Sequence, residues 1–128
     1  MASPSDKLTF YFRSVCPAPL GMENGAILDS QISASSEWSS IVAAHLARLH
    51  LQVGAWASSV NDLNQWLQVD LGSKTRVARI ATQGRADSIH GQWVTYYKLQ
   101  YSDNGQAFMF YRQNGHNLDT VPNFCLIY

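Results

Sequence analysis

The sequence lacks any excess of charge of either sign. Nine Lys and Arg residues balance nine Asp and Glu, so the formal net charge at pH 7 is zero, and charged residues make up only 14% of the chain. A general electrostatic attraction to nucleic acid or to an anionic membrane therefore has no basis in these totals. We expect no nucleic-acid partner, and any binding to an anionic surface must come from a local group of residues.

Long apolar runs are also missing. No stretch of 18 apolar residues occurs, so the sequence predicts no transmembrane segment. The first 15 residues carry Asp6, Lys7 and Arg13 in place of the continuous apolar stretch of a secretory signal. We therefore expect no signal peptide within this chain.

The motifs of common enzymes and metal sites are absent. The sequence has no phosphate-binding glycine loop, no Gly-x-Ser-x-Gly and no His-Glu-x-x-His, and its acidic residues are scattered singly. The four histidines lack metal-ligand spacing. Loop carbonyls with Asp87 or Asp29 are conceivable calcium ligands, but no Asp-rich loop accompanies them. We expect a non-catalytic protein without a cofactor, and keep a hydrolase as the weaker alternative because His, Ser and Asp could converge in space.

Cysteine is scarce, since only Cys16 and Cys125 are present. A bridge between them would close a long loop and stabilise the fold by on the order of 4 to 5 kcal/mol in an oxidising compartment. Two free thiols are the alternative reading. The pair is therefore a disulfide candidate.

Aromatic residues and alternating patterns predict an all-β domain. Aromatics make up 12% of the 128 residues, a length that suits one compact core. Leu67, Val69 and Leu71 alternate with polar residues, and similar patterns over 95–101 and 107–112 predict two more strands. The sequence Ser-Asp-Asn-Gly at 102–105 predicts a tight hairpin turn between them. The β-branched segment 75–82 is a less regular strand candidate.

The segment 39–53 has two readings. Two serines precede the run Ile-Val-Ala-Ala-His-Leu-Ala-Arg-Leu at 41–49, which is compatible with a capped helix on propensity alone. Further motifs of the chain favour a loop with at most one short helical turn, followed by a short strand.

Several motifs, taken in order, resemble those of the discoidin domain, also called the coagulation factor 5/8 C-type domain. Each motif alone is weak, but their colinear order from residue 16 to about residue 119 is specific. The matching steps are Cys-Pro-Ala-Pro-Leu-Gly-Met-Glu-Asn-Gly at 16–25, Ala-Ser-Ser at 34–36, Ala-Arg-Leu at 47–49, Gly-Ala-Trp at 54–56, Gln-Trp-Leu-Gln-Val-Asp-Leu-Gly at 65–72, Thr-Gln-Gly-Arg at 82–85 and Gln-Trp-Val-Thr at 92–95.

The resemblance implies a discoidin-like, galactose-binding-like antiparallel β-sandwich or jelly roll with ligand-binding loops at one end. It divides the chain into an N-terminal extension at 1–15 and a domain at 16–128. The family's usual last strands do not appear after Val121, so either the domain is a truncated form or Leu-Thr-Phe-Tyr-Phe at 8–12 supplies a replacement strand. In the family, a cysteine at the position of Cys16 pairs with one at the very end of the domain, which Cys125 matches poorly.

The resemblance also places the binding site on three loops, at 37–42, 50–53 and 85–91. Exposed apolar tips would enter a lipid interface, and Arg85, His50 and His90 would meet phosphate. The candidate ligand-binding residues are Trp38, Ser39, Ser40, Ile41, His50, Leu51, Gln52, Val53, Arg85, Asp87, Ser88, Ile89 and His90.

Three ligand classes fit these loops. They are a phospholipid headgroup, a glycan held as in lectin-type modules, and an extracellular protein such as collagen, for which Trp38 and Arg85 would line a trench. All three imply an extracellular or cell-surface module used in cell adhesion or surface attachment. Trp38 is the tryptophan expected to contact ligand, and Arg85 is as compatible with orienting its own loop as with contacting ligand.

The remaining tryptophans and Arg48 are expected to be structural. Trp56, Trp66 and Trp93 fall in or next to predicted strands, which predicts packing roles. Arg48 is expected to be a partly buried residue that holds loop carbonyls or a carboxylate such as that of Asp70.

Overall fold

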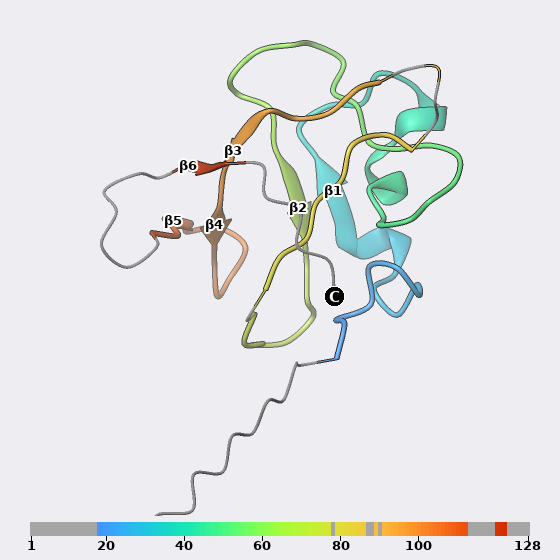
Figure 1. Cartoon of the computed structure of the whole chain (residues 1–128). Helices are drawn as coiled ribbons and strands as arrows, with labels where there is room; N and C mark the ends of the chain where they lie inside the picture. Colours follow the sequence, from blue (N-terminus) through green and yellow to red (C-terminus); the bar gives the residue numbers. More distant parts are fainter. Residues whose placement is uncertain (1–17, 78, 87–88, 90, 113–119, 123–128) are drawn as a thin grey trace, which may run out of the picture.

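Short strands and single helical turns make up the regular structure of the chain (Figure 1). The computed structural model describes residues 18–77, 79–86, 89, 91–112 and 120–122, the last three by their backbone. In chain order the elements are the 3₁₀ turn η1 (Asp29–Gln31), β1 (Ile32–Ala34), the 3₁₀ turns η2 (Ser40–Val42) and η3 (Ala44–Leu46), β2 (Leu67–Val69), β3 (Tyr96–Lys98), β4 (Gln100–Tyr101), β5 (Met109–Phe110) and β6 (Thr120–Pro122).

The β1–β2 pair forms the centre of the described structure. The two strands are antiparallel, with Ile32 opposite Val69 and Ala34 opposite Leu67. The side chain of Gln31 extends the pairing, because its Nε2 donates to the carbonyl oxygen of Asp70 at 2.7 Å. Val69 and Leu71 pack toward the core, as the alternation predicted, whereas Leu67, predicted on the same face, is 37% exposed.

Two further antiparallel pairs, β3–β6 and β4–β5, follow along the chain. The predicted hairpin is confirmed, since Gln100 lies opposite Phe110 and Tyr101 opposite Met109. Its turn is not the predicted tight one, because the connection spans 102–108. Asn104 Oδ1 accepts the backbone N–H groups of Gln106 and Ala107, each at 2.9 Å, and so holds a wider loop in which Gly105 has a φ of +69°.

All described strand pairs are antiparallel, which confirms the all-β prediction at that level. Each described sheet has two strands, so the described residues form three strand pairs and not a complete sandwich. No described helix is long and apolar enough to cross a bilayer. The segment 8–12, Cys16 and Cys125 lie outside the described residues.

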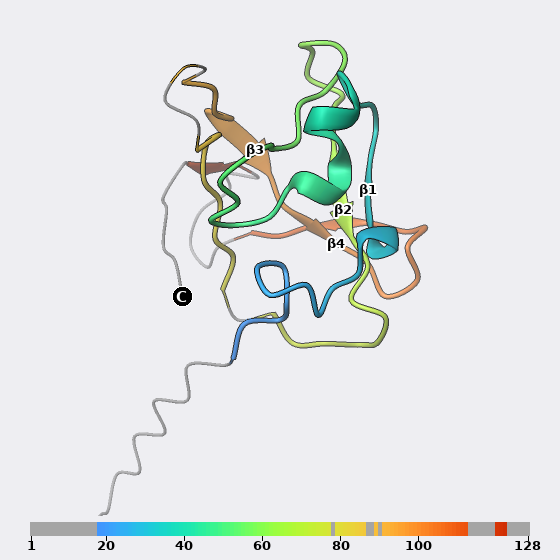
Figure 2. The same cartoon turned by 90° about the vertical axis from the view of Figure 1, so that its right-hand side faces the viewer.

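The core lies between β1, β2 and the turn η3. Ile27, Ile32 and Ala44 are buried together. Partly buried side chains complete the cluster and come from Met22, Ala34, Trp56, Val69 and Leu71. The turn η3 therefore packs against β1 and covers one side of this strand (Figure 2).

The segment 39–53 forms a loop with two short 3₁₀ turns, one more than the family resemblance predicts, and not the continuous helix that propensity alone allows. The reason is local, since Val42, Ala43 and Ala44 in succession are all buried. An amphipathic helix would turn one of any three consecutive residues outward. The short strand expected at the end of this segment is wrong, and so is the strand predicted over 75–82, whose described residues pair with no other strand.

Two of the three tryptophans predicted to be core residues are exposed. Trp66 is 50% exposed and Trp93 is 65% exposed, whereas Trp56 is partly buried against the core. Trp66 directly precedes β2, where its carbonyl oxygen accepts the N–H of Ser35 at 3.0 Å, and Trp93 lies three residues before β3. The core assignment is therefore wrong for Trp66 and Trp93 and confirmed for Trp56.

Candidate functional site

The first predicted loop, residues 37–42, is anchored at both ends and presents apolar side chains between its anchors. The backbone N–H of Trp38 donates to the carbonyl oxygen of Ala57 at 2.8 Å. The N–H of Ala57 in turn donates to the carbonyl oxygen of Val42 at 3.0 Å. Val42 is buried, whereas Trp38 is 72% and Ile41 is 69% exposed. Ser39 is half-buried and Ser40 exposed beside them. The loop therefore holds its two large apolar side chains out toward solvent on a fixed backbone.

The carboxylate of Glu37 connects this loop to the turn η3. Glu37 Oε1 accepts the backbone N–H of Ala44 at 2.7 Å, at the first residue of η3. That N–H would otherwise have no partner within so short a turn. Glu37 is thus a structural residue of the loop, because its carboxylate accepts a backbone hydrogen bond.

The second loop, residues 50–53, turns at a strained residue. His50 has a φ of +55°, a left-handed conformation that is uncommon for residues other than glycine. Its N–H donates to Gln83 Oε1 at 3.0 Å, and its Nδ1 lies 2.7 Å from Glu23 Oε1. The His50 side chain is therefore engaged with Glu23. At the tip, Gln52 is exposed and donates to the His50 carbonyl oxygen at 3.3 Å, Leu51 is half-buried, and Val53 is 84% exposed.

The third loop, residues 85–91, closes on itself through Gln92. The Arg85 N–H donates to the Gln92 carbonyl oxygen at 2.9 Å, and Arg85 Nη1 donates to Gln92 Oε1 at 3.2 Å. Ile89 is 84% exposed. Asp87, Ser88 and His90 lie outside the described residues. The partly buried Arg85 thus orients its own loop, which is one of the two roles predicted for it.

A glycine at the base of this loop lets the two ends of the loop approach each other closely. A Cβ atom on Gly84 would lie 3.0 Å from both the Gln92 carbonyl oxygen and the Trp93 Cβ. Such a distance is tighter than ordinary van der Waals contact, so a side chain here would push the two arms of the loop apart. Trp93, exposed next to this base, is the aromatic side chain whose accessibility the sequence did not indicate.

The three loops lie in one part of the molecule. In both views the first and third loops are toward the upper end, and the second lies just below the third (Figures 1 and 2). The bond from the His50 N–H to Gln83 ties the second loop to the segment that leads into the third. The structure therefore gathers the described members of the predicted site, with large apolar side chains among its exposed groups.

A fourth segment, residues 58–65, adjoins the first loop and was not predicted as part of the site. The segment lies at the upper end of the molecule with the first and third loops (Figures 1 and 2). Within it, Leu63 is fully exposed and Val60 is exposed. The sequence signal was a single leucine inside the polar run Asn-Asp-Leu-Asn-Gln at 61–65. An isolated apolar residue in such a run is often unremarkable, so the signal is weak without the structure.

The carboxylate of Asp62 holds the turn of this segment. Asp62 Oδ1 accepts Gln65 Nε2 at 2.9 Å and the backbone N–H of Asn64 at 2.8 Å. The Gln65 amide, followed by the Asn64 N–H, lowers the pKa of Asp62 below its ordinary value of 3.8, because both bonds favour the charged form.

We expect the turn at Asp62 to be intact at neutral pH and to loosen in acid. Because the pKa is lower in the folded chain, the carboxylate favours the folded turn above the ordinary pKa, and this contribution is lost as the pH falls through the lowered value. A carbon-detected NMR titration of Asp62 should give a midpoint below 3.8, and Gln65→Ala should raise it. Gln52→Ala is the control that should leave it unmoved. A midpoint insensitive to Gln65→Ala would show that the amide is not the cause.

Metal ligands do not gather among the residues that the structure describes, where no three His, Cys, Asp or Glu side chains come together. Of the two carboxylates considered for calcium, Asp29 is instead paired with Arg48. Asp87 is outside the described residues.

Comparison with known proteins gives consistent matches. The family model of the F5/8 type C domain matches residues 31–124. The chain is 41% identical to rat lactadherin over 108 residues, 42% identical to mouse coagulation factor V over 112 residues, and 43% identical to the human EGF-like repeat and discoidin I-like domain-containing protein 3 over 116 residues. These alignments cover 78%, 83% and 84% of the chain, but only 25%, 5% and 24% of the respective relatives. The chain therefore spans a quarter or less of the length of these relatives.

Proposed function

The chain belongs to the F5/8 type C, or discoidin, domain family, and from this we propose that it is a non-catalytic extracellular recognition module that attaches to phospholipid surfaces through its loop end. The family's β-sandwich, carrying these loops at one end, is the architecture that goes with this function. The role in cell adhesion or surface attachment belongs to the same proposal.

One observation supports the lipid ligand. Each of the three loops presents at least one large apolar side chain that is more than two-thirds exposed, namely Trp38, Ile41, Val53 and Ile89. Apolar groups held in water on fixed loops gain free energy by entering the interfacial region of a bilayer, about 1 to 3 kcal/mol each when desolvated. A tryptophan side chain also prefers the level of the headgroups, because its apolar ring can leave water there while its N–H remains hydrated.

The polar groups of the loops fit the same ligand better than they fit a glycan or a collagen trench. A glycan site needs several polar side chains aimed at one small volume. Here the Glu37 carboxylate is hydrogen-bonded to the Ala44 N–H, and the His50 ring is hydrogen-bonded to the Glu23 carboxylate. The Arg85 guanidinium is hydrogen-bonded to the Gln92 side chain. Among the described residues, these contacts use the side chains of Glu37, His50 and Arg85 to shape the loops, and we take the exposed apolar tips as the principal contact groups.

The test is to offer the purified chain, checked for folding by circular dichroism, to three surfaces in parallel. They are phosphatidylserine–phosphatidylcholine vesicles, fibrillar collagen and a glycan array. We expect sedimentation with the vesicles and a blue shift of tryptophan fluorescence, since Trp38 would leave water. Because the anchors are apolar, binding should persist at high salt. Selective binding to collagen or to a glycan, or binding to none of the three by a folded chain, would contradict the lipid ligand.

A further inference from the structure

The segment 58–65 shares the loop end of the molecule because of the way β1 and β2 pair. These strands are antiparallel with Ala34 opposite Leu67, so the chain leaves β1 at the end where it enters β2. The chain leaves β1 into the first loop and arrives at β2 from segment 58–65. The two loops are therefore neighbours at one end of the sheet (Figures 1 and 2).

Hydrogen bonds fix the segment to the base of the first loop. Gln65 Oε1 accepts the hydroxyl groups of Ser35 and Ser36, at 2.7 and 2.6 Å. Ser36 Oγ accepts the N–H of Ser59 at 3.1 Å, so both ends of the segment are held by residues just before the first loop. A loop tied at both ends to the same two serines has little freedom to move relative to Trp38.

Contacts inside the segment fix its turn as well. Ser58 Oγ donates to the Val60 carbonyl oxygen at 2.7 Å, and Asp62 Oδ1 accepts from Asn64 and Gln65 as described above. None of these contacts uses the side chain of Leu63, which is fully exposed. The turn is thus organised around a leucine that packs against nothing among the described residues.

We propose that residues 58–65 are a fourth contact loop of the lipid-binding end, with Leu63 as its apolar anchor. This inference rests on the proposed function and adds a residue to that site. A side chain held in place before binding loses little freedom on insertion, so more of its transfer free energy contributes to affinity. Asn61 and Asn64, on either side of the anchor, have the polar groups that a headgroup layer accepts.

The charge of Asp62 limits what this loop contributes. A carboxylate beside the anchor is repelled by an anionic surface, so the loop does not select phosphatidylserine over phosphatidylcholine. Leu63 should instead add the same factor to binding on both lipids and at any salt concentration. This separates the fourth loop from any headgroup recognition made elsewhere in the site.

The experiment compares binding of three variants to phosphatidylcholine vesicles with and without phosphatidylserine. Leu63→Ser should weaken partitioning about tenfold on whichever vesicles the unmodified chain binds. Leu63→Trp should retain or strengthen it, because Trp also partitions to the interface. Leu28→Ser is the matched control, since Leu28 is likewise exposed but precedes η1 at the opposite end of β1. It should bind as the unmodified chain does.

The outcomes separate this inference from the proposed function. If the unmodified chain binds vesicles and Leu63→Ser binds equally well, the fourth loop is wrong and the lipid-binding function stands. If Leu28→Ser loses as much vesicle binding as Leu63→Ser, the fourth loop is also wrong, because the effect on binding would then not be local to the loop. If the folded, unmodified chain binds neither vesicle, both proposals fail together. Because Leu63 is fully exposed, none of these variants should change the unfolding transition, which circular dichroism checks.

Discussion

Trp38→Ala should abolish measurable attachment to vesicles while leaving the fold intact. Trp38 is the largest of the exposed apolar side chains on the three loops. Removing a desolvated aromatic anchor typically costs about 2 kcal/mol or more of binding free energy, which is at least a thirtyfold loss of affinity. The free energy of unfolding should change by less than about 0.5 kcal/mol, as for surface positions in general, because the indole of Trp38 lies mostly in water.

Trp56→Ala is the matched control for this prediction. Trp56 packs against the core, and its Nε1 donates to the Ser36 carbonyl oxygen at 2.9 Å. Its removal should cost about 3 kcal/mol of stability, from lost packing and an unpaired carbonyl. Vesicle sedimentation and urea unfolding of both variants check the pair. If Trp38→Ala bound normally, the first loop would not be part of the site. If it unfolded the chain, Trp38 would be a packing residue.

Strand periodicity located β2 and the pair of β4 with β5, although only in β2 do described alternating residues pack toward the core. The inward alternation of Val69 and Leu71 and the hairpin of β4 with β5 follow from period-two patterns and from a turn rich in Asn and Gly. The turn itself could not be predicted, since Asn104 accepts backbone N–H groups with its side chain instead of adopting a left-handed conformation. Both options use the same residue types.

Exposure was the least predictable property. An alternating pattern tells which residues share a face but not whether another layer covers that face, so Trp66 and Trp93 were assigned to the core and are exposed. Of the candidate site, the apolar tips of the three loops were found through the family motifs. Leu63 was missed because its place beside the first loop depends on the hydrogen bonds of Gln65 with Ser35 and Ser36, which join residues about thirty positions apart.

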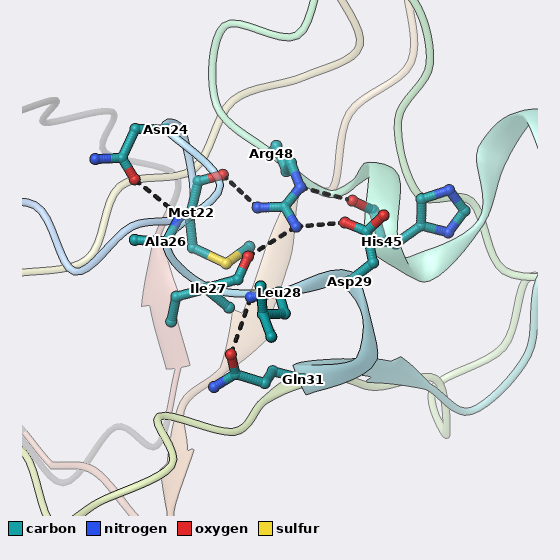
Figure 3. A network of polar contacts seen from close by, with 9 residues as sticks. All are labelled: Met22, Asn24, Ala26, Ile27, Leu28, Asp29, Gln31, His45 and Arg48. Carbon is teal, nitrogen blue, oxygen red and sulfur yellow. Dashed lines mark hydrogen bonds and ion pairs between the residues drawn. The ribbon is translucent and has the colours of Figure 1, made fainter.

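Arg48 shows how far a residue's role can be predicted without its partner. A structural arginine holding loop carbonyls was expected, and its side chain is only 13% exposed. Its guanidinium donates to the carbonyl oxygens of Met22, Ile27 and His45 at 2.9 to 3.0 Å (Figure 3). The expected carboxylate was that of Asp70, but the one in contact is that of Asp29. Five donors in a planar fork can reach several acceptors at once, and the sequence does not say which of them the loops bring near.

Arg48→Ala should therefore be the most destabilising single substitution among the described polar residues. It would leave three carbonyl oxygens without their donor and release the segment that precedes η1 from the turn η3 (Figure 3). We expect a loss of about 3 to 5 kcal/mol in the free energy of unfolding, a large part of the total stability of a small domain. Because η3 lies between the first two loops, vesicle binding should fall with the fold.

Two further variants separate the contribution of the carbonyl hydrogen bonds of Arg48 from that of its ion pair with Asp29. Asp29→Ala removes the ion pair but keeps the three carbonyl contacts, and because the Asp29 side chain is 66% exposed it should cost less than about 1 kcal/mol. Arg48→Lys keeps the charge but cannot reach three carbonyls in one plane, so its cost should lie between those of the other two variants. Urea unfolding with a common slope measures all three. Equal losses for Arg48→Ala and Asp29→Ala would mean that the ion pair, and not the set of carbonyl contacts, ties these segments together.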